Sequence, residues 1–176
     1  SLLLLFGILM ILFVFRRDSI TTPVAIPPGY ALAFYSQRIA GWLIDFVPFL
    51  VAASLATGVG VGEGLGTVMS WALHSTEIRP PRQDMLLFWG LAVGGHTVYM
   101  IVMEIFTGRT VGKVLTRTQV FAESGGRPRP VQLLVRNGVR MLELVPQFWF
   151  FALLAVVSRN QQRLGDVFGR TFVARR

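Results

Sequence analysis

The sequence predicts an all-α membrane protein: two transmembrane helices, a third at the N-terminus, and an amphipathic or re-entrant helical pair with a small cytoplasmic hairpin. Of its 176 residues, 53% are hydrophobic and only 15% are charged, whereas a soluble domain carries about 25% charged residues. The 17 basic residues outnumber the 9 acidic ones. A nucleic-acid-binding protein would spread such charge over a polar fold instead of separating it by long apolar runs, so we expect no nucleic acid partner.

The first apolar run covers residues 1–15 and precedes Arg16 and Arg17. It is shorter than the roughly 20 residues that cross a membrane core of about 30 Å. Because the chain starts inside this run, we interpret residues 1–17 as the end of a further transmembrane helix that anchors the chain. The core of a signal peptide is the alternative, and the helix is favoured because no small residues for a cleavage site follow.

Two later runs are long enough to cross a membrane. Residues 39–60 contain a single charge, Asp45, and residues 85–106 contain one near their end, Glu104. Each is predicted to be a transmembrane helix.

Small residues recur at spacings of four in both predicted helices. They are Ala52, Ala56 and Gly60 in the first helix and Gly90 and Gly94 in the second. Because small residues let membrane helices approach closely, we expect these two faces to meet.

Residues 131–145 carry one polar stripe on an otherwise apolar helix, which is typical of a helix at a membrane interface. The stripe consists of Gln132, Arg136, Arg140 and Glu143. Pro146 interrupts the pattern, and the apolar run at residues 147–157 is too short to cross a bilayer alone. We expect residues 131–157 to form a bent, re-entrant or interface-lying helical pair.

The distribution of basic residues predicts the orientation of the chain. Three lie in residues 16–38, two in 61–84, seven in 107–140 and five in 158–176. The positive-inside rule therefore places the loop 61–84 outside, and residues 107–140 and the C-terminus in the cytoplasm. Both ends of the helical pair are then cytoplasmic, and the basic segments suit anionic lipid headgroups.

Residues 114–123 alternate in a way that suits a short strand, and a Gly-Gly pair follows as a turn. Residues 171–174 are the expected partner strand, which would complete a hairpin-like cytoplasmic cap. We expect Asp166 to be held nearby by Arg163 or Arg170.

The segment GRTVGK at residues 108–113 invites comparison with a phosphate-binding loop, which requires four residues between its Gly and its Gly-Lys. Here there are three, and Val114 stands where Ser or Thr would bind the metal. We interpret the segment as a tight turn that places Arg109 and Lys113 at the lipid headgroups.

Asp45 is the charge whose position most needs an explanation, because an unpaired charge at a helix centre costs roughly 2.5 to 3.5 kcal/mol on insertion scales. Arg38 lies two turns away on the same face, about 10 Å along the axis. Arg136 or Arg140 is therefore the better partner. A buried carboxylate of this kind could carry a proton or cation; a structural ion-pair network is the favoured alternative.

His96 lies between the ends of the second helix, next to glycines. Hydrogen bonding to Thr or Tyr is expected, and ligation of a haem or chlorophyll-type ring is the alternative. We expect no other cofactor and no metal, since His74 has no second imidazole near it. With no recognisable nucleophile, base and acid, we expect no catalytic residues and no enzyme.

Four short motifs in this order resemble the RDD family of bacterial membrane proteins over about residues 30–174. They are Arg38, Ala40, Trp42, Ile44 and Asp45; Glu104 ahead of residues 107–113; Arg136, Asn137 and Arg140; and residues 162–166. The family is named for one Arg and two Asp, which Arg38, Asp45 and Asp166 match. The resemblance implies an inner-membrane location and a role that is mostly undefined, with transport suggested and cation–proton antiport proposed for some members.

Two classes of function remain. In the first, the protein is a non-catalytic accessory or structural subunit of a membrane complex or homo-oligomer, with other transmembrane subunits or itself as partner. In the second, an oligomer moves a cation, a proton or a small solute, with Asp45 as carrier and Arg38 and Glu104 tuning it. We favour the first, because three spans are few for an alternating-access transporter and no internal repeat is visible.

Overall fold

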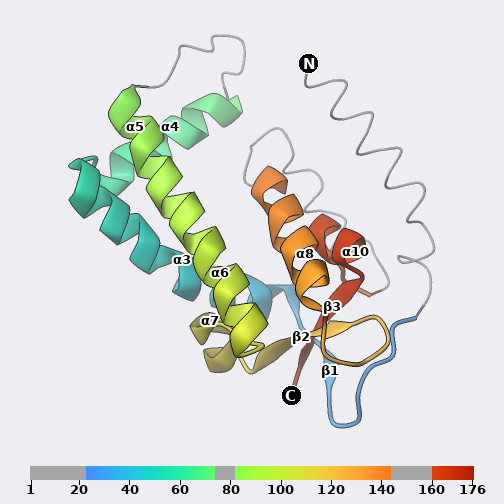
Figure 1. The fold of residues 1–176 in the computed structure, drawn as a ribbon. Coiled ribbons are helices and arrows are strands. Elements are labelled where there is room, and N and C mark those ends of the chain that lie inside the picture. Colours follow the sequence, from blue (N-terminus) through green and yellow to red (C-terminus); the bar gives the residue numbers. More distant parts are fainter. Residues whose placement is uncertain (1–22, 74–81, 144–159) are drawn as a thin grey trace, which may run out of the picture.

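The computed structural model describes residues 23–73, 82–143 and 160–176 (Figure 1). The predicted anchor at residues 1–17, His74 and most of the second half of the predicted helical pair lie outside the described residues. The elements are β1 (Ala31–Leu32), α3 (Tyr35–Thr57), α4 (Val61–Leu73), α5 (Gln83–Trp89), the π-helix η1 (Gly90–Gly94), α6 (Gly95–Phe106), α7 (Val111–Leu115), β2 (Thr118–Ala122), α8 (Pro130–Glu143), α10 (Leu164–Gly169) and β3 (Thr171–Arg175).

Both of the apolar helices predicted from the sequence are present and lie side by side (Figure 1). The first is α3, and the second runs through α5, η1 and α6 as residues Gln83–Phe106. Only 28% of the apolar window of each is buried, so most of their apolar surface faces outward, as in a membrane helix and unlike the core helix of a soluble protein. Helix α3 ends at Gly58, whose φ of 74° is the left-handed conformation that glycine adopts most readily.

The face that joins these two helices differs from the predicted one. Its buried residues are Phe46, Leu50, Ala53 and Val59 on one side and Met85, Phe88 and Ala92 on the other. Ala52 and Ala56 are exposed, and a Cβ at Gly60, Gly90 or Gly94 would have no neighbour within 4 Å. The predicted small-residue contact is therefore wrong.

The reason is that α3 has two different neighbours along its length. Its first half buries Gly41 and Asp45 toward α7, and its second half buries Leu50 and Ala53 toward α5. One residue step turns a helix by about 100°. The change of neighbour therefore brings Ala53 inward and leaves Ala52 outward.

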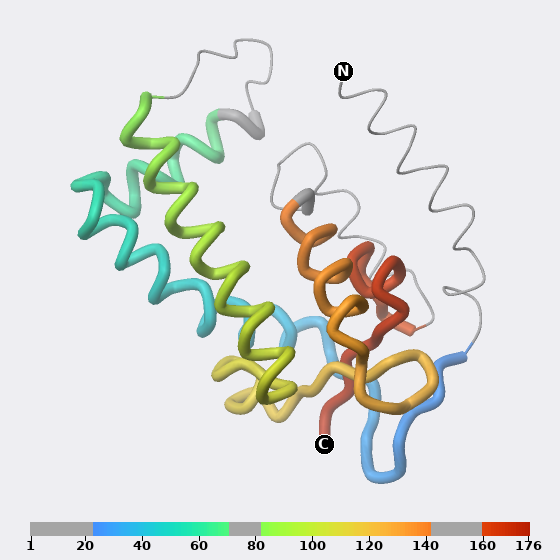
Figure 2. Tube along the Cα trace, viewed as in Figure 1, coloured from blue at the N-terminus to red at the C-terminus, as the bar shows by residue number. Residues whose placement is uncertain are grey.

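Close glycine packing occurs elsewhere, between α8 and α10. A Cβ at Gly165 would lie 2.5 Å from the carbonyl oxygen of Arg136, and one at Gly169 would lie 2.8 Å from that of Gln132. The two glycines are four residues apart, so they present one flat face on which the α8 backbone rests. Figure 2 shows α8 and α10 packed together beside α6.

The C-terminal strand forms the centre of a three-stranded antiparallel sheet in the order β1-β3-β2. The predicted pairing of a strand near residues 114–123 with residues 171–174 appears as Thr118 opposite Arg175 through Ala122 opposite Thr171. The start of the predicted strand is instead helix α7. Strand β1 was not predicted, because two residues are too few to show an alternating pattern.

Helix α8 is amphipathic, and the centre of its polar face is directed inward. Arg136 and Asn137 are buried, whereas Val131 is 67% exposed and Leu134 is 47% exposed. Buried carboxylates of neighbouring helices bind these polar groups, since Arg136 pairs with Asp166 and Asn137 donates to Glu104. Residues 144–157, where the second helix of the pair was predicted, lie outside the described residues.

Candidate functional site

Asp166 lies in the first turn of α10, between two arginines from other helices. Its Oδ2 is 3.2 Å from Nη1 of Arg38, and its Oδ1 is 3.0 Å from Nη1 of Arg136. The backbone N–H of Arg163 also donates to Oδ2. The sequence predicted Arg163 or Arg170 as the partner of Asp166. The contact with Arg163 is present through its backbone N–H, and the ion pairs come from Arg38 and Arg136, which were not predicted as partners.

The pKa of Asp166 reflects two opposed effects. Burial of the carboxyl group raises its pKa, but the positive charges of Arg136, Arg38 and Arg163 together outweigh burial and hold the pKa below its usual value of 3.8. Asp166 is therefore a charged carboxylate in the folded protein.

Arg38 forms a junction between the first membrane helix and the C-terminal segment. In addition to Asp166, its guanidinium donates to the carbonyl oxygen of Gln161 at 2.6 Å and to that of Val173 at 3.1 Å. These contacts tie the start of α3 to strand β3 and to the residues that precede α10.

Glu104, near the end of α6, is held by α7 and α8. Its carboxylate pairs with the ammonium group of Lys113 and accepts a hydrogen bond of 2.9 Å from Nδ2 of Asn137. Burial lowers the pKa of Lys113 to about 8, and the charge of Glu104 opposes this shift. Lys113 is therefore in the protein interior, and its predicted place at the lipid headgroups is wrong.

Asp45, in the middle of α3, accepts hydrogen bonds from neutral donors. These come from the backbone N–H of Gly112 at 2.7 Å, the hydroxyl of Tyr99 at 3.2 Å and the hydroxyl of Thr110. Thr110 also caps the start of α7. Of the two partners predicted for Asp45, Arg136 is paired with Asp166, and Arg140 lines the same cavity as Asp45.

Gly112 allows this arrangement, because α7 crosses α3 at Gly41. A Cβ on Gly112 would lie 2.0 Å from the carbonyl oxygen of Gly41 and 2.8 Å from Oδ2 of Asp45. Only a glycine permits the backbone N–H to reach the carboxylate. The segment at residues 108–113, predicted as a tight turn, thus provides donors for a carboxylate within the protein.

Most of the predicted polar cluster lines one cavity of about 40 Å³. The predicted members around it are Arg38, Asp45, Arg136, Arg140 and Asp166, and Lys113 also lines it. Glu104 is connected to this group through Lys113. A volume of this size holds water or a single small ion and is too small for an organic solute.

Several residues of this cluster were not among the predicted site residues. They are Tyr99, Thr110, Gly112 and Asn137, together with the interior position of Lys113. Gly and Thr recur at residues 107–112, directly after α6. Nothing in their spacing shows that this segment folds back onto α3.

His96 is buried against two aromatic rings. Its imidazole lies edge-on to Phe46 at 5.1 Å and to Phe49 at 5.8 Å between ring centres. Its Nε2 has no hydrogen-bond partner within the described part of the chain, so the expected bond to Thr or Tyr is not found at that atom. The phenylalanine rings occupy the space beside the imidazole, and the residues present do not fit a haem or chlorophyll-type ring.

The apolar outer faces of the helices and the charged interior define a membrane protein built around a buried polar cluster. Residues 32–170 match the model of the RDD family. The chain therefore belongs to the RDD family, as its motifs indicated. No curated protein and no solved structure matches the chain.

Proposed function

We propose that the protein is a non-catalytic structural or accessory subunit of a membrane complex or homo-oligomer in the bacterial inner membrane. The observation that supports this proposal is that each of three buried carboxylates joins three elements. Asp45 joins α3, α6 and α7; Glu104 joins α6, α7 and α8; and Asp166 joins α10, α3 and α8. The charges therefore act as cross-links between helices.

This use of charge has a physical basis. A buried charge is tolerated only when it is paired and hydrogen-bonded, and removal of one partner leaves the other at high cost. A carboxylate that carries a cation has to exchange its partners in every cycle. Asp45, Glu104 and Asp166 instead have donors in fixed positions on separate helices, which favours a scaffold.

The outward-facing small residues support association with other helices. Ala52 and Ala56 are exposed on α3, and Gly60 and Gly90 have open space at the Cβ position. Small residues on an outer face allow a second membrane helix to approach closely. We propose that this face, which does not join the two helices of one chain, contacts another subunit or a second copy.

The test is the mass of the purified particle in mild detergent, measured for the wild-type protein and for a variant with Ala52→Leu and Ala56→Leu. We expect a particle larger than one chain, from self-association or co-purified subunits, that dissociates in this variant. Val47→Leu is the matched control, since Val47 is already a large exposed residue on the same helix. A monomeric wild-type particle would contradict the proposal.

The alternative function is movement of a proton, a cation or a small solute with Asp45 as carrier. It is favoured by the position of Asp45 on the wall of the cavity that Arg38 also lines, and the cavity volume limits the cargo to a proton or a single ion. If the purified protein in liposomes moves protons or Na⁺ and Asp45→Asn abolishes this flux, transport replaces the structural role. An unchanged flux in Asp45→Asn would remove Asp45 as the carrier.

A further inference from the structure

A second cavity lies beyond the end of α6 and is strongly basic. Its volume is about 330 Å³, and its lining residues are Tyr30, Arg109, Val114, Arg117, Gln119 and Arg176. No acidic residue lines it, and none of its three arginines forms an ion pair within the described residues. Three arginines line one space, and guanidinium groups bind anions that have several oxygens.

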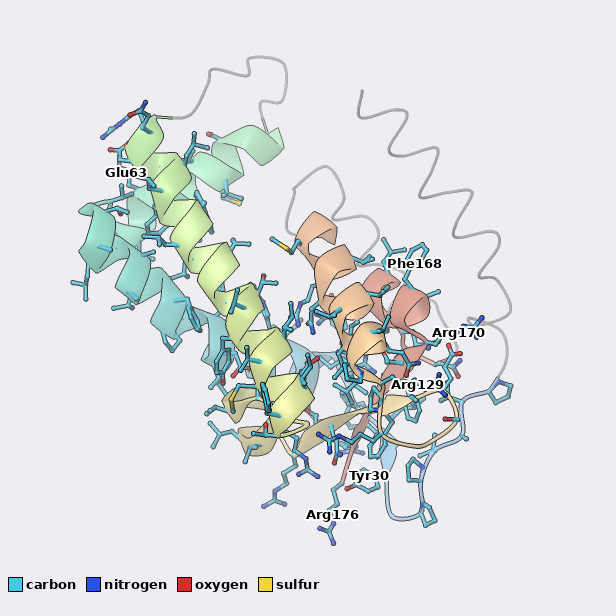
Figure 3. The ribbon with its side chains drawn as sticks, in the orientation of Figure 1. Tyr30, Glu63, Arg129, Phe168, Arg170 and Arg176 are labelled. Atoms are coloured by element: carbon cyan, nitrogen blue, oxygen red, sulfur yellow. The ribbon has the colours of Figure 1, made fainter. Side chains whose placement is uncertain are left out.

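The cavity lies at the boundary that the second membrane helix defines. Helix α6 ends at Phe106, which is 77% exposed. The outer face of α7 continues this apolar surface with Val111, Val114 and Leu115, all more than half exposed. In Figure 3, Tyr30 and Arg176 are at the same end of the molecule as the end of α6 and as α7. Basic and apolar surfaces thus meet where a bilayer would change from headgroups to acyl chains.

Each of the three arginines has a hydrogen bond to a neighbouring segment. Arg117 has a φ of 55°, a conformation that side-chain-bearing residues rarely adopt. Its backbone N–H donates to the carbonyl oxygen of Val114, and its own carbonyl accepts from the N–H of Arg176, each at 3.1 Å. Arg109 donates to the side-chain oxygen of Gln119. The hydrogen bond between their backbones places Arg117 and Arg176 next to each other at one cavity.

We infer that this basic cavity binds the phosphate headgroup of an anionic phospholipid, whose acyl chains lie along Val111, Val114 and Leu115. The three arginines provide charge and paired donors for phosphate oxygens, and the Tyr30 hydroxyl adds a further polar group. A free phosphate would use the arginines equally well. The adjoining exposed apolar face of α7 is the observation that favours a lipid as the source.

The test is equilibrium binding of a fluorescent phosphatidylglycerol to the full chain in detergent, with unlabelled lipids as competitors. Phosphatidylglycerol is expected to compete strongly, and phosphatidylcholine weakly. Arg117→Asn is expected to weaken binding about fivefold, and addition of Arg176→Gln a further fivefold or so, the effect of one arginine near an anionic lipid surface. Asn is chosen because it tolerates the left-handed backbone at this position.

Arg170→Asn is the matched control. Arg170 also has a left-handed backbone, with a φ of 50°, and is exposed on the turn before β3, away from Tyr30 and Arg176 (Figure 3). It should bind the lipid like the wild-type protein, and the thermal unfolding midpoints should show that all variants are folded. Equal losses in Arg117→Asn and Arg170→Asn, or equal competition by phosphatidylcholine, would overturn the inference. If glycerol phosphate displaces the fluorescent lipid at the same concentration as phosphatidylglycerol does, the site binds a free phosphate and the proposal of a lipid ligand is overturned.

Discussion

Asp166 shows how single residues allow a charged interior in an apolar chain. Its carboxylate lies between guanidinium groups from the first membrane helix and from α8, with its side chain only 3% exposed. The partners come from positions far apart in the sequence, and each would be an uncompensated buried charge without the carboxylate.

We predict that Asp166→Asn destabilises the protein by about 3–5 kcal/mol, the usual cost of removing one partner of a buried ion pair. The measurement is the free energy of unfolding in detergent. Asp84→Asn is the control, because Asp84 pairs with Arg82 at the exposed start of α5, where an ion pair contributes little. Equal losses in both variants would show that the central charges of Asp166, Arg38 and Arg136 are not a cross-link.

The lowered pKa of Asp166 predicts a dependence of stability on pH. The folded-state pKa lies below the ordinary value of 3.8, so the folded protein binds fewer protons than the unfolded chain in this range. The stabilisation by Asp166 is therefore complete above pH 3.8 and is lost as the pH falls through the lowered folded-state value. The thermal unfolding midpoint of the wild-type protein should fall when the pH is lowered below 3.8. The Asp166→Asn variant should lack the part of this fall that protonation of Asp166 causes.

At the scale of elements, contact between helices depends on glycines whose importance is not visible in their own segments. Helix α7 rests on α3 through Gly112 and Gly41, and α10 rests on α8 through Gly165 and Gly169. These contacts bring backbones close enough for an N–H of α7 to reach a carboxylate of α3. The short helices α7 and α10 thus complete the polar cluster.

We predict that Gly112→Ala destabilises the protein by about 3 kcal/mol, the upper end of the usual cost of overpacking, because its Cβ would overlap the backbone of Gly41. Gly138→Ala is a control of opposite sign. Gly138 lies inside α8 with open space around its Cβ position, so alanine should stabilise the helix by about 0.5–1 kcal/mol. The unfolding midpoints of both variants provide the comparison, and a tolerated Gly112→Ala would contradict the close contact of α7 and α3.

At the scale of the whole molecule, large apolar side chains cover the outer faces of the two long helices, and several charged side chains are buried between the helices. Two helices long enough to span a membrane expose Leu55, Leu87 and Val98, while three carboxylates are buried between them and α7, α8 and α10. The exposed apolar helix faces suit an apolar surrounding.

The orientation in the membrane is a prediction that single cysteines can test, because the chain contains no Cys. Ser70→Cys lies in α4 within the predicted outside loop, and Ser124→Cys follows β2 in the predicted cytoplasmic segment. A maleimide that does not cross membranes should label Ser70→Cys in intact cells and Ser124→Cys only after permeabilisation. The reverse pattern would invert the orientation, and the cysteine-free wild-type protein measures the background.

The class of this protein and several of its elements could be predicted from the sequence alone. The two apolar helices, the paired strand segments and the RDD motifs depend on the length and local order of residues. For the same reason the sequence identified Arg38, Asp45, Arg136 and Asp166 as members of a polar cluster without showing which of them touch.

Only the tertiary structure decided the pairing. Arg38 and Asp166 are 128 residues apart, and no local pattern shows that Arg38 contacts Asp166 while Asp45 receives donors from the loop after α6. No local pattern shows that the polar face of α8 is directed inward. No local pattern shows that Ala53, and not Ala52, lies at the contact between the two long helices. Hydropathy and spacing report how each segment divides between apolar and polar surroundings, but the direction of each face depends on which distant segment offers a complementary charge or a close-fitting glycine.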